Sequence, residues 1–145
     1  MSLFKIIMLN SCKYSSVLLI DDDVDDRMIF GDVLKELVPD IIYNEAINGE
    51  DALEKLEKNL VPDLIFLDLN MPRVDGKQFL AEMQKIDHLK HIPVVIYTTS
   101  SHESDKKETH ALGAACFFTK PNSLRELSHK LSSILEGKIE QPGVV

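Results

Sequence analysis

The chain has 145 residues, the size of a single domain, and its 16 Lys and Arg against 24 Asp and Glu give a formal charge of −8. This acidic balance excludes a nucleic acid or an anionic membrane surface as a direct partner, because both require a basic face. No apolar run in the sequence approaches the roughly 20 residues of a membrane span, and the two cysteines, Cys12 and Cys116, indicate a reducing compartment. We therefore expect a cytoplasmic protein.

The two ends of the chain differ from the rest. The apolar stretch Phe4–Leu9 is interrupted by a lysine, whereas a secretion signal needs about 7–15 apolar residues. The last residues show no periodicity. We expect a loose N-terminal arm over residues 1–16, one domain over 17–136 and a flexible tail over 137–145.

Five short apolar runs follow one another along the domain. Unbroken runs of this length are typical of strands buried on both faces, as in a parallel sheet. The runs are Val17–Ile20, Ile41–Tyr43, Leu64–Leu67, Val94–Tyr97 and Ala114–Phe118.

Apolar residues recur at helical spacing between and after these runs. Asp23 or Asp25, Asn48 and Asp75 are suitable N-caps for the first three helices, and Gly113 is a suitable end for the fourth. The fourth helix, Glu103–Leu112, is much more polar than the others. Five alternations of strand and helix predict an α/β fold with a doubly wound parallel sheet and helices on both faces.

Ligands of such sheets bind beyond the carboxyl ends of the strands. Carboxylates, hydroxyls and one lysine follow the predicted strands, so we expect them to meet at this edge. They are Asp21, Asp22 and Asp23 after the first strand, Asp68 after the third, Thr98, Thr99 and Ser100 after the fourth, and Lys120 with Pro121 after the fifth.

The charges at this edge predict a metal and a reaction. Asp21, Asp22 and Asp68 bring three negative charges against one positive charge from Lys120, and the excess matches one divalent cation. Carboxylate oxygens suit Mg²⁺, which also attracts phosphoryl donors. Asp68 is then a candidate nucleophile that forms an acyl phosphate, while Lys120 and the Thr98 hydroxyl hold the other phosphoryl oxygens.

From Val17 to about Leu135 the chain resembles the response-regulator receiver domain, the phospho-acceptor of two-component signalling. The resemblance is carried by short motifs that surround the candidate site residues. They are Leu19-Ile20-Asp21-Asp22, Leu67-Asp68-Leu69-Asn70-Met71-Pro72, Val74-Asp75-Gly76, Ile92-Pro93-Val94-Val95-Ile96-Tyr97-Thr98 and Lys120-Pro121. It implies a flavodoxin-like (βα)5 fold with strand order 2-1-3-4-5.

The resemblance also implies roles for individual residues. Asp22 would bind the metal directly, Asp21 mostly through water, and Asn70 through its backbone carbonyl. Thr98 and Phe117 would form the switch pair. The peptide bond between Lys120 and Pro121 would be cis.

Several features depart from the usual family pattern. Thr99 stands where a small residue is common, and its hydroxyl is a further candidate to contact the phosphoryl group. Phe117 lacks the hydroxyl of the more usual Tyr. Five acids lie between Asp21 and Asp26, of which Asp23, Asp25 and Asp26 are interpreted as a helix cap and first-turn acids.

Two alternatives come from the same acidic segment. A haloacid-dehalogenase-type phosphatase would use Asp21, but it needs a further acidic motif after the lysine, where the sequence offers only Glu126, Glu136 and Glu140. A calcium loop would place Asp21, Asp23, Asp25 and Asp32 at its ligand positions, but its sixth residue is Asp26 instead of Gly.

We therefore predict a stand-alone receiver, similar in style to those that serve phytochrome-type kinases, and not an enzyme acting on other substrates. Its partners would be a histidine kinase or phosphotransfer protein and either a downstream target or a second copy. The predicted output face combines the fourth helix, the fifth strand and the fifth helix.

Overall fold

The computed structural model describes residues 11–138. Strands and helices alternate throughout this range. In chain order they are β1 Ser16–Ile20, α1 Val24–Leu37, β2 Ile42–Ala46, α2 Gly49–Glu57, β3 Leu64–Leu67, α3 Gly76–Met83, β4 Val94–Thr98, α4 Glu103–Ala111, β5 Cys116–Thr119 and α5 Leu124–Leu135.

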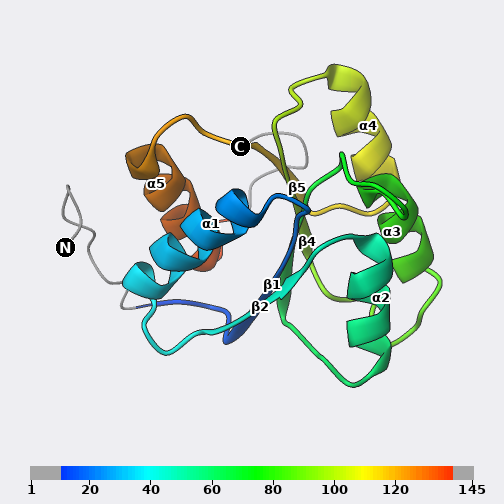
Figure 1. The fold of residues 1–145 in the computed structure, drawn as a ribbon, viewed down its shortest axis with the longest axis horizontal. Helices are drawn as coiled ribbons and strands as arrows, with labels where there is room; N and C mark the ends of the chain where they lie inside the picture. Colours follow the sequence, from blue (N-terminus) through cyan, green and yellow to red (C-terminus); the bar gives the residue numbers. More distant parts are fainter. Residues whose placement is uncertain (1–10, 139–145) are drawn as a thin grey trace.

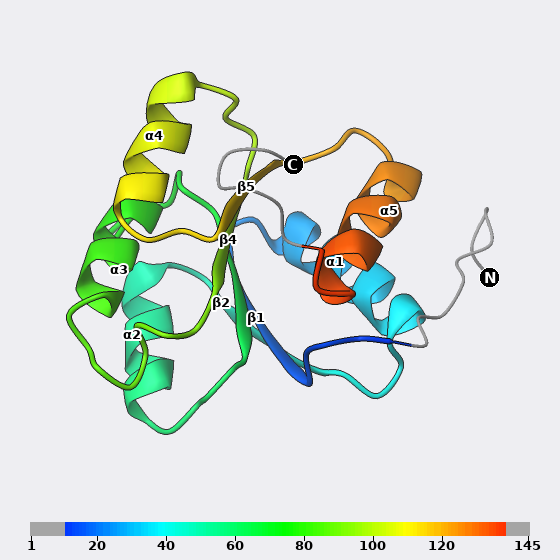
Figure 2. The ribbon, with the colours of Figure 1, turned by 180° about the vertical axis from the view of Figure 1, so that it is seen from behind.

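The five strands form one parallel sheet in the order β2-β1-β3-β4-β5, which confirms the predicted doubly wound topology. Helices α1 and α5 cover one face of this sheet, and α2, α3 and α4 cover the other (Figure 1). The view from behind shows the same two layers (Figure 2). The order reverses beside β1, so the carboxyl ends of β1 and β3 face the same crevice.

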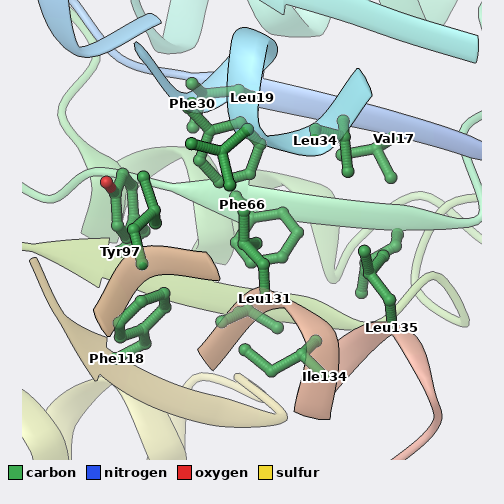
Figure 3. Close-up of a cluster of buried hydrophobic side chains, with 14 of the residues drawn as sticks. Val17, Leu19, Phe30, Leu34, Phe66, Tyr97, Phe118, Leu131, Ile134 and Leu135 are labelled. Carbon is green, nitrogen blue, oxygen red and sulfur yellow. The ribbon is translucent and has the colours of Figure 1, made fainter. Parts of the chain in front are cut away.

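Side chains alternate between the two faces of the sheet and divide the core in two. Figure 3 shows the cluster under α1 and α5, where Phe30, Phe66 and Tyr97 pack together. The Phe30 ring centroid lies 4.9 Å from that of Phe66 and 5.4 Å from that of Tyr97. The second cluster lies under α2 and α3 and includes Phe79, Leu80 and Phe117.

The predicted strands differ from the structure at the edge of the sheet. β3 and β4 are buried throughout, as predicted, but β2 is only partly buried and Ile42 is 58% exposed. β2 is an edge strand, which explains why its apolar run is short and why polar residues continue it.

The predicted arm is wrong for its last residues. Ser16 is the first residue of β1, and Cys12 and Tyr14 pack against the core. The Lys13 amide also donates a 2.8 Å hydrogen bond to the Leu135 carbonyl, because the entering chain passes the end of α5. Residues 1–10 and 139–145, which contain the rest of the predicted arm and most of the tail, lie outside the described residues.

Side-chain caps begin most of the helices. Asp23, Asn48 and Asp75 cap α1, α2 and α3 as predicted, and Asp75 forms a reciprocal capping box with Gln78. His102, at the start of α4, makes no side-chain cap hydrogen bond within residues 11–138. None of the described helices is long and apolar enough to cross a membrane.

Candidate functional site

Three carboxylates meet at the carboxyl end of the sheet. Asp21 and Asp68 directly follow β1 and β3, and the backbone pairing continues through them, since the Asp68 amide donates to the Ile20 carbonyl at 2.9 Å. One oxygen each from Asp21, Asp22 and Asp68 lies within 4.8 Å of the others. Asp21 is fully buried, Asp68 is 6% exposed and Asp22 is open to solvent.

The carboxylates of Asp21 and Asp68 differ in their distance from Lys120. Asp21 accepts hydrogen bonds on both oxygens, from the Asp23 amide at 2.9 Å and from Lys120 Nζ at 2.8 Å. Asp68 lies 3.6 Å from Lys120 Nζ and accepts from the Asn70 amide at 3.4 Å, with the Thr98 hydroxyl and the Leu69 amide as further donors. Lys120 is therefore bound more closely to Asp21 than to Asp68.

Both buried carboxylates are shifted toward the protonated form. Burial raises the pKa of Asp21, although the hydrogen bond from Lys120 lowers it in part. Burial likewise raises the pKa of Asp68, against the lowering effects of the Lys120 charge and of a hydrogen bond from Thr98. The three carboxylates supply oxygen donors at close range, and a bound divalent cation would favour their charged form.

Lys120 is the cation of the pocket. Its Nζ lies 2.7 Å from Asp26 and 2.8 Å from Asp21, and its amide donates to the Thr98 carbonyl at 2.7 Å. Burial alone would lower the pKa of Lys120, but the hydrogen bonds to Asp21 and Asp26 and the charge of Asp68 outweigh burial, so the net pKa is raised. The ammonium stays charged at neutral pH.

The expected cis bond before Pro121 is wrong. No peptide bond is cis within residues 11–138, so Lys120 and Pro121 are joined in trans. Trans is the lower-energy isomer of an X–Pro bond by about 0.5–1 kcal/mol unless packing overrides it. The lysine reaches the carboxylates with the bond in this isomer.

The remaining predicted residues differ in burial. Thr98 is fully buried at the end of β4, and its hydroxyl accepts from the Ser100 amide at 3.4 Å. Thr99 and Asn70 are exposed. Phe117 lies on β5, beside Ile96 of β4, and is only 4% exposed, with Lys106 Nζ 5.8 Å from its ring centre. Phe117 is therefore already turned inward in this state.

Gly76 explains one of the motifs that surround the acceptor. A Cβ atom at this position would lie 2.3 Å from the Asp68 carbonyl oxygen and 2.8 Å from Leu69 Cα. Any larger residue would push the start of α3 away from the Asp68 loop. The glycine after Asp75 thus allows α3 to begin against the backbone of the candidate nucleophile.

Two residues of the site were missed from the sequence. Asp26 was interpreted as a first-turn acid of α1, yet it contacts Lys120. Arg27 received no role, but it donates a 2.7 Å hydrogen bond to the Asp21 carbonyl and lies 3.4 Å from Glu45. Both contacts depend on which side of α1 faces the sheet, and the apolar positions Phe30, Val33 and Leu34 could have indicated that side.

Comparison with known proteins agrees with this geometry. Residues 17–132 match the family described as the response regulator receiver domain. This chain belongs to that family. As a receiver domain, it is part of two-component phosphorelay signalling, in which such domains are phosphorylated on an aspartate. The prediction of a receiver is thereby confirmed, and the phosphatase alternative is not favoured.

Individual relatives support the same assignment. The receiver is 35% identical over 124 residues to response regulator Rcp1 of Synechocystis, covering 81% of this chain and 84% of Rcp1. It is 35% identical over 111 residues to protein PilG of Pseudomonas aeruginosa, covering 77% of this chain and 80% of PilG. It spans only 36% of a protein-glutamate methylesterase of Methanospirillum hungatei, which is 38% identical over the match.

Two solved structures have the same fold. The Mn²⁺-bound form of Rcp1 matches with a TM-score of 0.76 and 31% identity, covering 90% of this chain and 99% of that one. The phosphorylated cyanobacterial phytochrome response regulator RcpA matches with a TM-score of 0.79 and 27% identity, over the same shares of the two chains.

The calcium-loop alternative does not fit the receiver structure. Helix α1 already begins at Val24, and Asp32 is an exposed residue in its middle. A loop of 12 residues cannot wrap an ion where the chain is helical. Within residues 11–138, the potential metal-binding group is formed instead by Asp21, Asp22 and Asp68.

Proposed function

We propose that this receiver accepts a phosphoryl group on Asp68 from the phosphohistidine of a histidine kinase or phosphotransfer protein. The observation that carries the proposal is the place of Asp68 in the acidic cluster. One oxygen each of Asp21, Asp22 and Asp68 lies within 4.8 Å of the others. Lys120 Nζ lies 2.8 Å from Asp21 but 3.6 Å from Asp68, so Asp68 is the buried carboxylate that the lysine leaves more available as a nucleophile.

The transfer is balanced at a single phosphorus atom. A carboxylate oxygen of Asp68 attacks the phosphorus, a P–O bond forms, and the P–N bond to the donor imidazole breaks with its electron pair returning to nitrogen. Hydrolysis reverses the state of the receiver, because water attacks the same phosphorus and regenerates the Asp68 carboxylate and inorganic phosphate.

The acidic cluster would hold Mg²⁺ for this reaction. Asp22 and Asp68 would be direct ligands together with the Asn70 backbone carbonyl, and Asp21 would act mostly through water. The close set of carboxylates and its surplus negative charge support this assignment. Bound Mg²⁺ supplies charge neutralisation for the phosphoryl oxygens.

The other side chains would bind the transferred group. Lys120 is charged and close to the acceptor, so it is suited to pair with a phosphoryl oxygen. The buried Thr98 hydroxyl would donate to another oxygen, and the exposed Thr99 hydroxyl would provide a further contact. These roles need no substrate other than the phosphoryl donor, so we expect no enzymatic activity on further substrates.

Intact-mass spectrometry after incubation with acetyl phosphate tests the proposal. We expect one added phosphoryl mass with Mg²⁺, none with a chelator, and none in Asp68→Asn. Peptide mapping should place the label on Asp68. A label on a histidine, or one that persists in Asp68→Asn, would refute the assignment.

We also propose where the signal leaves the domain. The face formed by α4, β5 and α5 carries a hollow of about 300 Å³ lined by Lys106, Phe117 and Lys130, among others. Movement of Thr98 toward the phosphoryl group would disturb Phe117 on the neighbouring strand and thereby this face. A downstream target or a second copy would bind here, in the cytoplasm.

A further inference from the structure

Lys120 is shared unequally among three carboxylates. Its Nζ lies 2.7 Å from Asp26, 2.8 Å from Asp21 and 3.6 Å from Asp68. The two closer partners belong to the β1–α1 segment, and the distant one is the proposed acceptor. In the resting state the ammonium is therefore drawn away from the residue that receives the phosphoryl group.

We infer that Asp26 is a positioning residue that retains Lys120 in the resting receiver and competes with the phosphoryl group for it. This inference rests on the proposed roles of Asp68 and Lys120. Asp21 is buried and also bound by a backbone amide, so its place is part of the fold. Asp26 is 34% exposed at its side chain and can release the lysine into solvent.

The first turn of α1 determines which aspartate contacts Lys120. Asp23 is the N-cap, and its carboxylate accepts from the amides of Asp25 and Asp26. From this start, the Asp26 side chain reaches Lys120, whereas the exposed Asp25 forms no salt bridge with the lysine within residues 11–138. The two neighbouring aspartates thus differ in contact but not in charge, so Asp25 provides a matched control.

The charge balance gives the direction of the effect. Asp21, Asp22, Asp26 and Asp68 bring four negative charges to the site, and Lys120 with one divalent cation brings three positive charges, which leaves one negative charge in excess. A phosphoryl donor is itself an anion. Removing the Asp26 charge should therefore favour donor binding and leave Asp21 as the one close partner of Lys120, so that the ammonium is more available to the bound phosphoryl group.

The test compares Asp26→Asn, Asp25→Asn and Asp26→Glu in the full chain with acetyl phosphate and Mg²⁺. We expect Asp26→Asn to lower the half-saturating acetyl phosphate concentration and to slow hydrolysis of the phosphorylated receiver, each by about three- to tenfold. Asp25→Asn should change either quantity by less than about twofold, and Asp26→Glu should restore wild-type behaviour because it keeps the charge. A purely structural role for Asp26 would not produce this pattern.

Equal values in Asp26→Asn and Asp25→Asn, or a higher half-saturating concentration in Asp26→Asn, would overturn the inference. The Lys120 side-chain nitrogen resonance provides a second reading without any donor. It should shift in Asp26→Asn and stay in place in Asp25→Asn, and an unchanged resonance in Asp26→Asn would by itself refute the resting contact. If the wild type gains no phosphoryl mass, the proposed function fails, while the resonance still decides the contact between Asp26 and Lys120.

Discussion

Helices α1 and α5 on one face of the sheet and α4 on the other are held by different forces. Helix α1 buries Phe30, Val33 and Leu34, and α5 packs beside it with Leu131 and Ile134 in the same cluster. Of the described residues 103–111 in α4, only Thr109 is buried. Apolar burial holds a helix regardless of salt, whereas polar contacts can be exchanged at low cost. The comparison indicates that α1 and α5 form the scaffold and that α4 is the part able to move.

Polar side chains secure α4 in place of a core. Lys77 of α3 lies 2.7 Å from Asp105 and 3.0 Å from Glu108, and the Ser100 hydroxyl donates to Asp105. The Ser100 amide in turn donates to Thr98. One chain of hydrogen bonds therefore joins the buried threonine of the pocket to the helix that is most weakly packed.

The largest expected effect comes from the scaffold. Phe30→Ala removes a fully buried ring that contacts Phe66 and Tyr97, so it should lower the free energy of unfolding by about 3–5 kcal/mol. Urea unfolding monitored by circular dichroism measures this loss. An equally large loss from Lys107→Ala, on the exposed side of α4, would break the distinction between α1 and α4.

A smaller effect comes from the pocket, where the carboxyl groups oppose folding. Because the folded pKa of Asp68 is raised, the unfolding free energy of the metal-free protein should fall as pH rises from about 4 to the folded pKa, and stay low above it. Asp68→Asn should remove this penalty, which is about 1.4 kcal/mol for each unit of raised pKa.

The measurement is urea unfolding in chelator at several pH values. Asp68→Asn should be more stable than wild type at pH 7 and should lose this advantage below about pH 4. Asp22→Asn, at the exposed member of the cluster, should mainly abolish stabilisation by Mg²⁺. A wild type whose unfolding ignores millimolar Mg²⁺ would contradict the metal assignment.

Thr98→Ala should lower the free energy of unfolding by about 1 kcal/mol. It should also uncouple phosphorylation of the receiver from the changes in α4 and β5. A beryllofluoride adduct, which mimics the phosphoryl group, should change amide exchange in α4 and β5 of the wild type. The variant should still gain phosphoryl mass while these changes disappear. If the adduct alters only the residues that line the pocket in the wild type, the proposed output face is wrong.

The smallest effect on global stability is expected from Lys77→Met, about 0.5 kcal/mol, because this lysine is partly exposed. Its local effect should be larger, with faster amide exchange throughout α4 and unchanged exchange in α1. Lys55→Met, which removes a surface pair with Asp51, is the control and should leave α4 unchanged. If the α4 amides exchange as slowly in Lys77→Met as in the wild type, contacts other than this ion pair secure the helix.

The sequence predicted the site better than its surroundings. Asp21, Asp68, Thr98 and Lys120 each follow an apolar run, and in a parallel sheet the ends of such runs must share an edge. The contact between Asp26 and Lys120 could not be found in this way, because it depends on the rotation of α1 about its own axis.

Three further features were missed. The exposure of β2 depends on its place in the sheet, which an apolar run does not encode, so Ile42 resembled a buried residue. The contact between Lys13 and Leu135 joins the two ends of the domain and leaves no local pattern. The trans bond before Pro121 was missed because the resemblance, and not the residues themselves, suggested cis.

The sheet places the proposed phosphorylation site and the proposed contact face on different strands. The proposed acceptor follows a strand that has a neighbour on both sides and side chains buried on both faces. The proposed contact face lies at the far edge, on the strand that has a neighbour on one side. A target that binds at β5 therefore meets a strand with one unpaired edge, while the strand that precedes the proposed acceptor stays paired on both sides.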